Sequence, residues 1–306
     1  MKLSVLINNY NYARFLSEAL ASVSAQSLAP HEIIVVDDGS TDESLQVLEN
    51  LAATTPGLRI HAQTNGGQIS ALRAAVMLAT GDWCVFLDAD DTWAPDHLAE
   101  LTAAIAGNPE ISAYYCAHRE TEGPPVYRIP WPAGALGPSM ALVYVTRLRI
   151  GTLTSAISLR LDMARQAVEL DPSLYADWRI RADDCLVYGA ALSGAIAYHN
   201  TRSTVHYRIH GGNFYARRDR SLAEYRDKFR LARLCAFFAE RNGIHERDLP
   251  DHIERELEFP HNAAPYVRRR YRRAIRRLRV AGLLTKVRLY LKSLSCPASR
   301  RFCGNP

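Results

Sequence analysis

The stretch Trp83-Cys84-Val85-Phe86-Leu87-Asp88-Ala89-Asp90-Asp91 decides the fold of this chain. Its first five residues are all apolar, as in a strand that is buried on both faces of a sheet. The three carboxylates that follow would repel one another unless a positive charge lies among them. Divalent cations take carboxylate oxygens, and parallel sheets bind ligands at the carboxyl ends of their strands. The stretch therefore predicts a metal site at a sheet edge; a polar strand end followed by a helix cap is the alternative.

Strand and helix patterns alternate through the first 120 residues. Short apolar segments predict strands at 3–8, 32–36, 58–62, 83–87 and 111–116. Amphipathic spacing predicts helices over 15–23, 71–79 and 98–105, and one that opens with a capping box at 40–43 and turns Leu45, Leu48 and Leu51 inward. This alternation predicts an α/β fold with a mostly parallel sheet, flanked by helices on both faces.

The pattern loosens after residue 117. Residues 118–150 are rich in proline and glycine and are expected to form a long connection or flap. Regular patterns then predict a strand near 153–159, a helix over 183–193, strands near 195–199 and 203–208, and helices from 221 onward. We expect one domain over 1–215, with halves of about 1–117 and 118–215, followed by a basic helical region over 216–306.

The formal net charge of +5 for 306 residues conceals an asymmetry. Residues 1–120 hold five basic and fifteen acidic side chains, whereas residues 266–306 hold thirteen basic and no acidic ones. The six cysteines are scattered, without the spacing of a zinc site or a disulfide framework, as in a reduced cytosolic protein. No secretory signal and no apolar run of about 20 residues is found, so a cytoplasmic location is expected.

Residues 267–279 carry eight arginines around one apolar stripe. One interpretation is a solvated helix that packs on the domain through Val267, Tyr271, Ala274, Ile275 and Leu278. The other is an interfacial helix whose arginines, Arg268–Arg279, contact an anionic membrane surface at the inner face of the cell membrane. No nucleic acid is expected as a partner, because no nucleic-acid-binding signature accompanies the arginines.

Polar groups follow each of the first four predicted strands. They are the segments Asn8–Asn11, Asp37–Ser40, Thr64–Gln68 and Asp88–Asp91. All four lie on one edge if the sheet is parallel, which makes that edge the expected ligand crevice. Neither a dinucleotide-binding glycine motif nor a phosphate-binding Gly-Lys-Ser/Thr loop is present. A phosphate group must then be held by basic side chains and by Mg²⁺ or Mn²⁺ bound to Asp88 and Asp90.

These segments together resemble family 2 glycosyltransferases of the GT-A fold. The resemblance rests on residues 4–11, 37–42, 65–67 and 81–91 in that order, and continues more weakly to about residue 213. It implies a nucleoside-diphosphate sugar as donor, with a UDP-sugar favoured, a divalent metal (Mn²⁺ or Mg²⁺), and inversion at the anomeric carbon. It also implies a saccharide or lipid-linked acceptor in polysaccharide or glycolipid biosynthesis.

The resemblance assigns roles by position. Asp38 would meet the uracil or equivalent base, with Asn8, Asn11 and Asn65 lining the nucleoside. Asp88 would lie near the ribose and the metal, and Asp90 would be the main metal ligand. The catalytic base would belong to the acidic pair Asp183–Asp184, with Asp184 favoured.

Two further roles concern the diphosphate. His210 would complete the metal site, and Arg208 would offset the diphosphate charge. The family often carries Ala-Arg-Asn after Asn65, but this chain has Ala71-Leu72-Arg73, so Gln68 or Arg73 is left to replace that arginine.

Two other functions remain open from the sequence. A nucleotidyltransferase also uses an open α/β sheet and a carboxylate-bound metal, but it normally has a basic glycine-rich loop where this chain has Asn8–Asn11. A non-catalytic sugar- or membrane-binding relative would be favoured if Asp88, Asp90 or Asp184 were missing, and all three are present.

Overall fold

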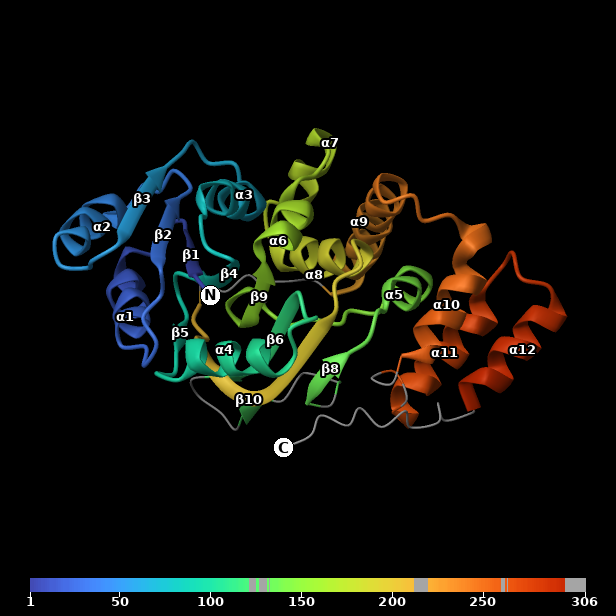
Figure 1. Cartoon of the computed structure of the whole chain (residues 1–306). Helices are drawn as coiled ribbons and strands as arrows, with labels where there is room; N and C mark the ends of the chain where they lie inside the picture. The colour runs from blue at the N-terminus through green and yellow to red at the C-terminus, as the bar shows by residue number, and fades with distance from the viewer. Residues whose placement is uncertain are drawn as a thin grey trace, which may run out of the picture.

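The computed structural model describes residues 1–120, 125–126, 131, 133–211, 220–259, 262 and 264–294. Figure 1 shows a twisted sheet in one half of the molecule and a group of helices at the other end, with α2 and α12 farthest apart. Some residues used in the sequence analysis lie outside this range. They include Asn213, where the weaker resemblance ends, and the last two cysteines, Cys296 and Cys303.

The sheet has the strand order β3-β2-β1-β4-β9-β6-β10-β5. Its neighbours β1–β2, β1–β4, β2–β3 and β6–β10 pair in parallel, and β9 and β5 run antiparallel to theirs. The prediction of a mostly parallel sheet is therefore confirmed. The strands are β1 (Leu3–Asn9), β2 (Glu32–Asp37), β3 (Leu58–Ala62), β4 (Trp83–Asp88), β5 (Thr92–Trp93), β6 (Ala113–Glu120), β7 (Pro125–Val126), β8 (Gly134–Leu136), β9 (Ile157–Arg160) and β10 (Ala197–Tyr207).

Helices cover both faces of the sheet, as predicted. Alternate side chains of β1 divide between two apolar clusters: Val5 and Ile7 pack with α1, α2 and α4, and Leu6 packs with α3, α6 and α8. Figure 1 shows these two groups on opposite sides of the strands. The helices are α1 (Ala13–Ser24), α2 (Ser44–Ala52), α3 (Gln68–Leu78), α4 (His97–Gly107), α6 (Leu161–Val168), α7 (Pro172–Tyr175) and α8 (Ala182–Leu192).

The expected capping box at residues 40–43 is wrong. Helix α2 begins at Ser44, whose backbone N–H donates to Asp42 Oδ1 at 3.0 Å. Ser40 instead donates its hydroxyl to Asp37 Oδ2 at 2.6 Å, which holds it at the end of β2. The shift of the helix start leaves Leu48 buried and turns Leu45 outward, so Leu45 was placed wrongly as well.

Two more boundaries differ from the sequence prediction. The strands expected near 195–199 and 203–208 form one strand, β10, whose register against β6 shifts between Asn200 and Val205. The expected flap over 118–150 contains the end of β6, β8 and the helix α5 (Met140–Thr146). Its residues 121–124, 127–130 and 132 lie outside the described range.

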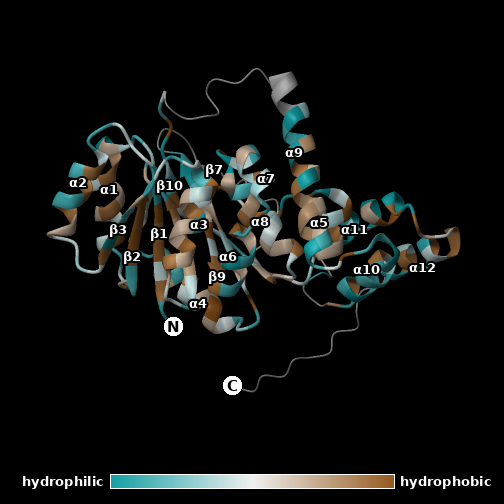
Figure 2. Cartoon of the chain, turned by 90° about the horizontal axis from the view of Figure 1, so that it is seen from above, coloured by the Kyte–Doolittle hydropathy of each residue, from teal (hydrophilic) through white to brown (hydrophobic). Residues whose placement is uncertain are grey.

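The C-terminal helices are α9 (Arg220–Arg241), α10 (Leu249–Glu258), α11 (Pro265–Arg277) and α12 (Leu283–Leu294). Apolar side chains of all four join the cluster that begins under the sheet at Leu6, so the core continues across the predicted boundary at residue 215. Figure 2 shows apolar residues along the sheet strands and between these helices. Among the described residues, no helix has both the length and the apolar character needed to span a bilayer.

Candidate active site

The strand register brings the predicted polar segments to one edge. Asn8 on β1 pairs with Asp88 on β4, and Asn9 pairs with Asp37 on β2. Asp37 in turn pairs with Ala62 at the end of β3. Strand β10 runs parallel to β6 and delivers Arg208 and His210 to the same edge. The ends of five strands therefore lie at the edge where the ligand crevice is expected.

Asp88 lies at the centre of this edge. Gln68 donates from Nε2 to Asp88 Oδ1 at 3.0 Å, and the backbone N–H of Asp88 donates to Ser155 Oγ at 3.0 Å. Burial, followed by the negative charge of Asp90, raises the pKa of Asp88 to about 7. The charge of Asp183 adds to this effect, which means that the acidic pair on α8 faces the strand-end cluster.

Asp90 is 7% exposed, and its Oδ2 lies within hydrogen-bond distance of His210 Nε2, at 3.0 Å. The ring of His210 is itself packed against Phe15, with ring centroids 4.9 Å apart. Arg208 donates from Nε to the backbone oxygen of Asp90 at 3.0 Å. The guanidinium group of Arg208 also pairs with Glu18 on α1, so this arginine ties the site to the first helix.

Asp91 anchors the loop. It accepts hydrogen bonds from Ser155 Oγ at 2.5 Å and from the backbone N–H of Arg208 at 2.9 Å. Burial and the charges of Asp90 and Asp88 raise its pKa well above the ordinary value. Asp91 therefore connects three separate segments, whereas Asp88 and Asp90 present carboxylates to the crevice.

The donor atoms at this edge fit a hard divalent cation. Asp88 and Asp90 supply carboxylate oxygens, and the Oδ1 atom of Asn8 is buried without a hydrogen-bond partner. Among the described residues, no group of three or more His, Cys, Asp or Glu side chains is placed so that it could hold a metal ion by itself. Mg²⁺ and Mn²⁺ sites that bind phosphorylated substrates commonly use one or two carboxylates and complete the shell with water and phosphate.

Asp38 organises the loop that follows β3. Its carboxylate accepts from the backbone N–H groups of Gly66 at 2.9 Å and Gly67 at 2.7 Å, and from Gln63 Nε2 at 2.7 Å. Asn65 donates from Nδ2 to the Asp38 backbone oxygen at 2.8 Å. Asp38 is 3% exposed, so a contact with a nucleobase stays a prediction, and the loop that Asp38 shapes is the surface such a base would meet.

Asn11 performs a similar task on the other side of this loop system. Its backbone is left-handed, with φ of 58°, and its Oδ1 accepts from the backbone N–H of Thr41 at 2.7 Å. Its own N–H donates to Ser40 Oγ at 2.9 Å. The structure thus places Asn11 between the ends of β1 and β2, where it fixes the two loops relative to each other.

Arg179 contacts the loop at Asn65 and the start of α3 from a distant part of the chain. Its guanidinium group donates to Asn65 Oδ1, and its backbone oxygen accepts from the N–H of Gln68 at 2.8 Å. Gly67 has φ of 87°, and a Cβ atom on it would lie 2.6 Å from Arg179 Cα. The glycine is therefore required both by its backbone conformation and by the closeness of Arg179.

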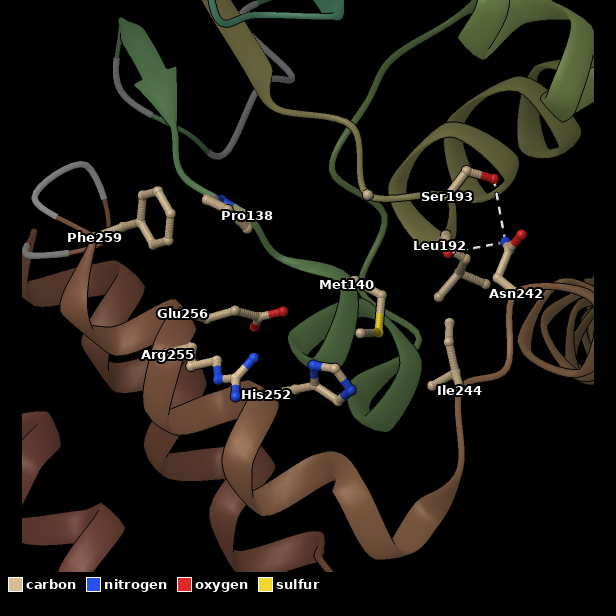
Figure 3. A pocket seen from close by; sticks show the side chains of 11 residues that line it. Pro138, Met140, Leu192, Ser193, Asn242, Ile244, His252, Arg255, Glu256 and Phe259 are labelled. Carbon is tan, nitrogen blue, oxygen red and sulfur yellow. Dashed lines mark hydrogen bonds between the residues drawn. The ribbon is translucent and has the colours of Figure 1, made fainter.

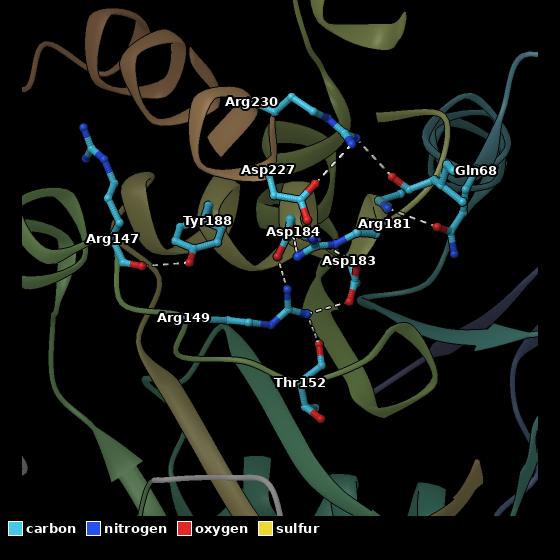
Figure 4. Close-up of polar contacts among 12 residues, drawn as sticks. Gln68, Arg147, Arg149, Thr152, Arg181, Asp183, Asp184, Tyr188, Asp227 and Arg230 are labelled. Carbon is cyan, nitrogen blue, oxygen red and sulfur yellow. Dashed lines mark hydrogen bonds and ion pairs between the residues drawn. The ribbon is translucent and has the colours of Figure 1, made fainter. Parts of the chain in front are cut away.

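The acidic pair lies at the N-terminus of α8, and its two members differ (Figure 4). Asp184 pairs with Arg149 and, at 2.7 Å, with Arg181, and its side chain is 5% exposed. The Asp183 side chain is 16% exposed and pairs with Arg149 at 2.6 Å. Arg181 continues to Asp227 on α9, so Asp184 belongs to a chain of alternating charges that joins two helices.

Gln68 bridges the two acidic clusters. Its Nε2 donates to Asp88 Oδ1, and its Oε1 accepts from the backbone N–H of Ala182 at 3.0 Å. Figure 4 shows Gln68 beside Arg181 at the start of α8. The bond to Ala182 satisfies one of the free N–H groups at the start of α8. One side chain of α3 thereby sets the spacing between Asp88 and the pair at 183–184.

Sequence reasoning missed Arg149, Arg179 and Ser155. Arg149 and Arg179 come from segments without a predicted helix or strand, and Ser155 lies in the segment predicted as a strand near 153–159; each acts on a residue more than 30 positions away. Arg73 was considered as a nucleotide contact. Its positive charge lowers the pKa of Tyr175, against the larger effect of burial, so it acts beside Tyr175. The one local signal of a basic partner for the acidic pair Asp183–Asp184 was Arg181, two positions before it.

A separate hollow lies away from the strand ends. It has a volume of about 490 Å³ and is lined by residues of α5, α8, α10 and the end of α9, among them Met140, Asn242, His252 and Glu256 (Figure 3). Phe259 and Arg255 also line it. The predicted site residues do not line it.

Known proteins resemble this chain in sequence. A family model described as glycosyl transferase family 2 matches residues 4–158, slightly more than half of the chain. An uncharacterized glycosyltransferase of Nostoc sp. is 34% identical over 230 residues, which cover 70% of this chain and 66% of that protein. A PGL/p-HBAD biosynthesis glycosyltransferase of Mycobacterium bovis is 40% identical over 115 residues, 37% of this chain and 44% of that protein. The chain thus matches less than two thirds of the length of these curated relatives.

Solved structures resemble it in fold. The structure of S. aureus TarS residues 1–349 with UDP-GlcNAc has a TM-score of 0.60 at 18% identity and covers 97% of this chain and 89% of that one. A mannosyltransferase from Pyrobaculum calidifontis with GDP-Man and Mn²⁺ has a TM-score of 0.51 at 18% identity, with coverages of 96% and 79%. These neighbours support the GT-A-type fold expected from the motifs. With the family match over residues 4–158, the chain belongs to glycosyl transferase family 2.

Proposed function

We propose that this chain is an inverting glycosyltransferase of glycan biosynthesis. It moves a sugar from a nucleoside-diphosphate sugar to an acceptor hydroxyl. The observation that carries the proposal is the pair of acidic clusters that face each other across Gln68, one at the strand ends and one at the start of α8. The first suits a leaving diphosphate with its metal, and the second suits the attacking hydroxyl.

On the donor side, Asp88, Asp90 and His210 would hold Mn²⁺ or Mg²⁺. When bound, the metal acts as a Lewis acid that stabilises the charge on the leaving diphosphate. Asp91, Ser155 and the backbone of Arg208 keep the two ligand carboxylates in position. Asn8, Asn11, Asn65 and Asp38 would line the nucleoside, and Arg179 joins them as a cationic contact that replaces the arginine absent after Asn65.

On the acceptor side, we propose Asp183 as the catalytic base in place of Asp184. A base must reach the proton of the attacking hydroxyl, and Asp184 is almost fully buried with arginines on both oxygens. Asp183 is the more exposed of the two, and its negative charge contributes to the raised pKa of Asp88. Asp184 then serves as a positioning residue that fixes Arg149 and Arg181 around the base.

The reaction follows from this division. Asp183 takes the proton from the acceptor hydroxyl while the hydroxyl oxygen forms a bond to the anomeric carbon, on the face opposite the nucleotide. The bond between that carbon and the diphosphate oxygen breaks at the same time, and its electron pair leaves with the nucleoside diphosphate. Attack from the opposite face inverts the anomeric carbon.

The relatives support the substrate classes without fixing them. TarS was solved with UDP-GlcNAc and the Pyrobaculum mannosyltransferase with GDP-Man and Mn²⁺, so both nucleotides occur on this fold. We favour a UDP-sugar as donor. A match to a chondroitin synthase of Pasteurella multocida and the match to the mycobacterial glycosyltransferase support a saccharide or lipid-linked acceptor. We further propose that the enzyme works in the cytoplasm, at the inner face of the cell membrane.

The test is a screen of the full chain for thermal stabilisation by UDP, GDP and dTDP, each with and without Mn²⁺. We expect a rise in Tm that needs both nucleotide and metal, followed by metal-dependent hydrolysis of the matching nucleotide-sugar. A chain that responds to none of the three nucleotides would contradict the proposal and favour a non-catalytic relative. Product that incorporates the nucleotide itself would instead favour a nucleotidyltransferase.

A further inference from the structure

Helix α12 leaves one apolar face uncovered. The side chains on it are Leu283 (77% exposed), Leu284 (86%), Val287 (47%), Tyr290 (40%), Leu291 (59%) and Leu294 (58%). At 100° per residue they share about one third of the helix circumference. We call this set the α12 apolar face. Soluble monomers rarely expose so many large apolar residues side by side, and such patches commonly mark an interaction surface.

The opposite side of α12 fixes how the helix is turned. Leu289 and Ser293 are buried, and the backbone oxygen of Lys292 accepts from Arg268 Nη1 at 3.1 Å. Lys292 also pairs with Glu258 at 2.6 Å and Glu254 at 3.1 Å on α10. Because these contacts hold the helix on α10 and α11, the apolar face cannot turn inward without breaking them.

Cations border the α12 apolar face. On the helical wheel, Lys286 lies beside one edge of the face, and Arg288, which pairs with Glu254 on α10 at 2.9 Å, lies beside the other. The preceding arginines Arg276, Arg277 and Arg279 are exposed. Residues 266–306 contain thirteen basic and no acidic side chains, so no negative charge within this segment balances them. A leucine-rich face bordered by Lys and Arg matches an anionic lipid surface, which offers acyl chains and negative headgroups together.

Helix α11 is not the inserting element, contrary to one interpretation of its arginines. Its stripe of Val267, Tyr271, Ala274 and Ile275 is buried against the rest of the chain. Arg268 is 4% exposed and donates from Nη2 to the Leu257 backbone oxygen at 2.7 Å. The helix therefore packs on the domain, and its remaining arginines can contribute charge beside a membrane without entering it.

We propose that the α12 apolar face lies in the headgroup region of an anionic bilayer, with the neighbouring arginines and lysines paired to lipid phosphates. The inference deepens the proposed function, since it rests on an enzyme that works at the inner face of the cell membrane. In Figures 1 and 2, α12 lies at the end of the molecule opposite α2. Attachment through α12 thus leaves the strand-end site free on the other half of the chain.

The experiment is flotation of the full chain with vesicles of phosphatidylcholine alone or mixed with phosphatidylglycerol. We expect the protein to float with the mixed vesicles, to bind on the order of tenfold less to the neutral ones, and to be released by salt. No binding to the mixed vesicles overturns the proposal, whether a second copy of the chain or its own C-terminal residues cover the leucines instead. Equal binding to both vesicles also overturns it, because the cations would then contribute nothing.

Variants separate the apolar contribution from misfolding and from catalysis. Leu284→Gln/Leu291→Gln removes two exposed side chains and should lower vesicle binding on the order of tenfold at unchanged Tm. The matched control is Met77→Gln on α3, which is 57% exposed and should bind as the parent does. Donor hydrolysis in solution should be equal in all three proteins, so failure of the membrane proposal and failure of the glycosyltransferase proposal give different results. A double variant that binds like the parent contradicts the assignment to α12, and light scattering that shows a dimer lost in it, with no lipid binding by the parent, identifies a second copy as the occupant.

Discussion

Two acidic clusters sit on either side of Gln68, and the protein treats them differently. At the strand ends, Asp88, Asp90 and Asp91 are close enough that their mutual repulsion, with burial, raises the pKa of Asp88 and Asp91. At the start of α8, Asp183 and Asp184 are paired with Arg149 and Arg181. The chain thus supplies guanidinium groups to one cluster and leaves the other with an excess of negative charge.

This difference indicates which of the two clusters would gain more from a bound cation. A carboxylate that already has an arginine on each oxygen gains little from a metal, whereas crowded buried carboxylates gain much. The strand-end cluster is therefore where we propose that a metal binds. In the α8 pair, Arg149 and Arg181 hold the Asp184 carboxylate in position, and Arg149 also pairs with Asp183.

The largest effect is expected for Asp90→Ala. Loss of the main metal ligand should remove metal-dependent donor binding and lower turnover on the order of 10⁴-fold, because Lewis-acid stabilisation of the leaving group is worth several kcal/mol. Titration calorimetry of the nucleoside diphosphate with and without Mn²⁺ measures it. Asp82→Ala, at an exposed site outside the cluster, is the matched control. An Asp90→Ala protein with the parent's metal-dependent affinity would remove the contrast between the two clusters.

The next effect separates the members of the α8 pair. Asp183→Asn should lower kcat on the order of 10³-fold, as expected for loss of a base, with donor affinity and Tm nearly unchanged. Asp184→Asn should instead destabilise the fold by about 3 kcal/mol, because Arg149 and Arg181 lose their buried counter-charge. Steady-state kinetics and chemical denaturation on the same preparations decide between them. If Asp183→Asn turned over normally while folded Asp184→Asn did not, Asp184 would be the base.

A smaller effect is expected at the bridge between the clusters. Gln68→Ala removes the hydrogen bonds to Asp88 Oδ1 and to the N–H of Ala182. We expect kcat to fall about thirtyfold, since two net hydrogen bonds of about 1 kcal/mol each position the clusters. Gln68→Glu keeps the acceptor for Ala182 but adds a charge beside Asp88, so its kcat should fall further. A Gln68→Ala protein with unchanged kcat would show that the spacing is set elsewhere.

The smallest effect on activity is expected at Glu256, a buried carboxyl group outside the two clusters. Its negative charge is neutralised by a proton, and not by a metal or an arginine. It accepts from the N–H of Ala141 at 2.7 Å and from the Tyr271 hydroxyl at 2.9 Å, and burial raises its pKa to about 8. Because the folded chain keeps a proton that the unfolded chain loses, this contribution to stability is complete below about pH 4.5 and is lost as the pH rises through about 8.

Glu256→Gln should therefore flatten the decline in unfolding free energy between pH 5 and pH 8.5, by up to a few kcal/mol, and leave kcat unchanged. Urea denaturation at both pH values measures the slope. Glu254→Gln on the same helix, which is partly exposed and paired with Lys292, is the control and should keep the parent's slope. A slope that stays the same in Glu256→Gln would mean that Glu256 is charged in the folded chain.

Much of the fold could be predicted because it is encoded locally. The strands 3–9, 32–37 and 83–88 are apolar runs buried on both faces, and their bounds differ from the prediction by one residue at most. Helix α2 shows the limit. Ser40 and Glu43 have the spacing of a capping box, but the Ser40 hydroxyl donates to Asp37 and the helix starts only at Ser44.

The site divides in the same way. Residues at strand ends, such as Asp88 and Asp90, can be predicted from their position directly after an apolar run. The choice between Asp183 and Asp184 does not, because it depends on Arg149, which is 34 and 35 positions away in the chain. Contacts of that kind are made by tertiary packing, and no local pattern specifies them.

The pairing of Asp91 with Arg208 has a consequence for how the protein is made. The two residues are 117 positions apart, and β5 finds its partner β10 only when residues 205–206 are available. Strands β1 to β4 can pair early during synthesis, since they are close in sequence. The edge that carries Asp88, Asp90 and Asp91 is completed only after residue 208 has left the ribosome, so a shorter nascent fragment has strands β1 to β4 but not the contact between Asp91 and Arg208.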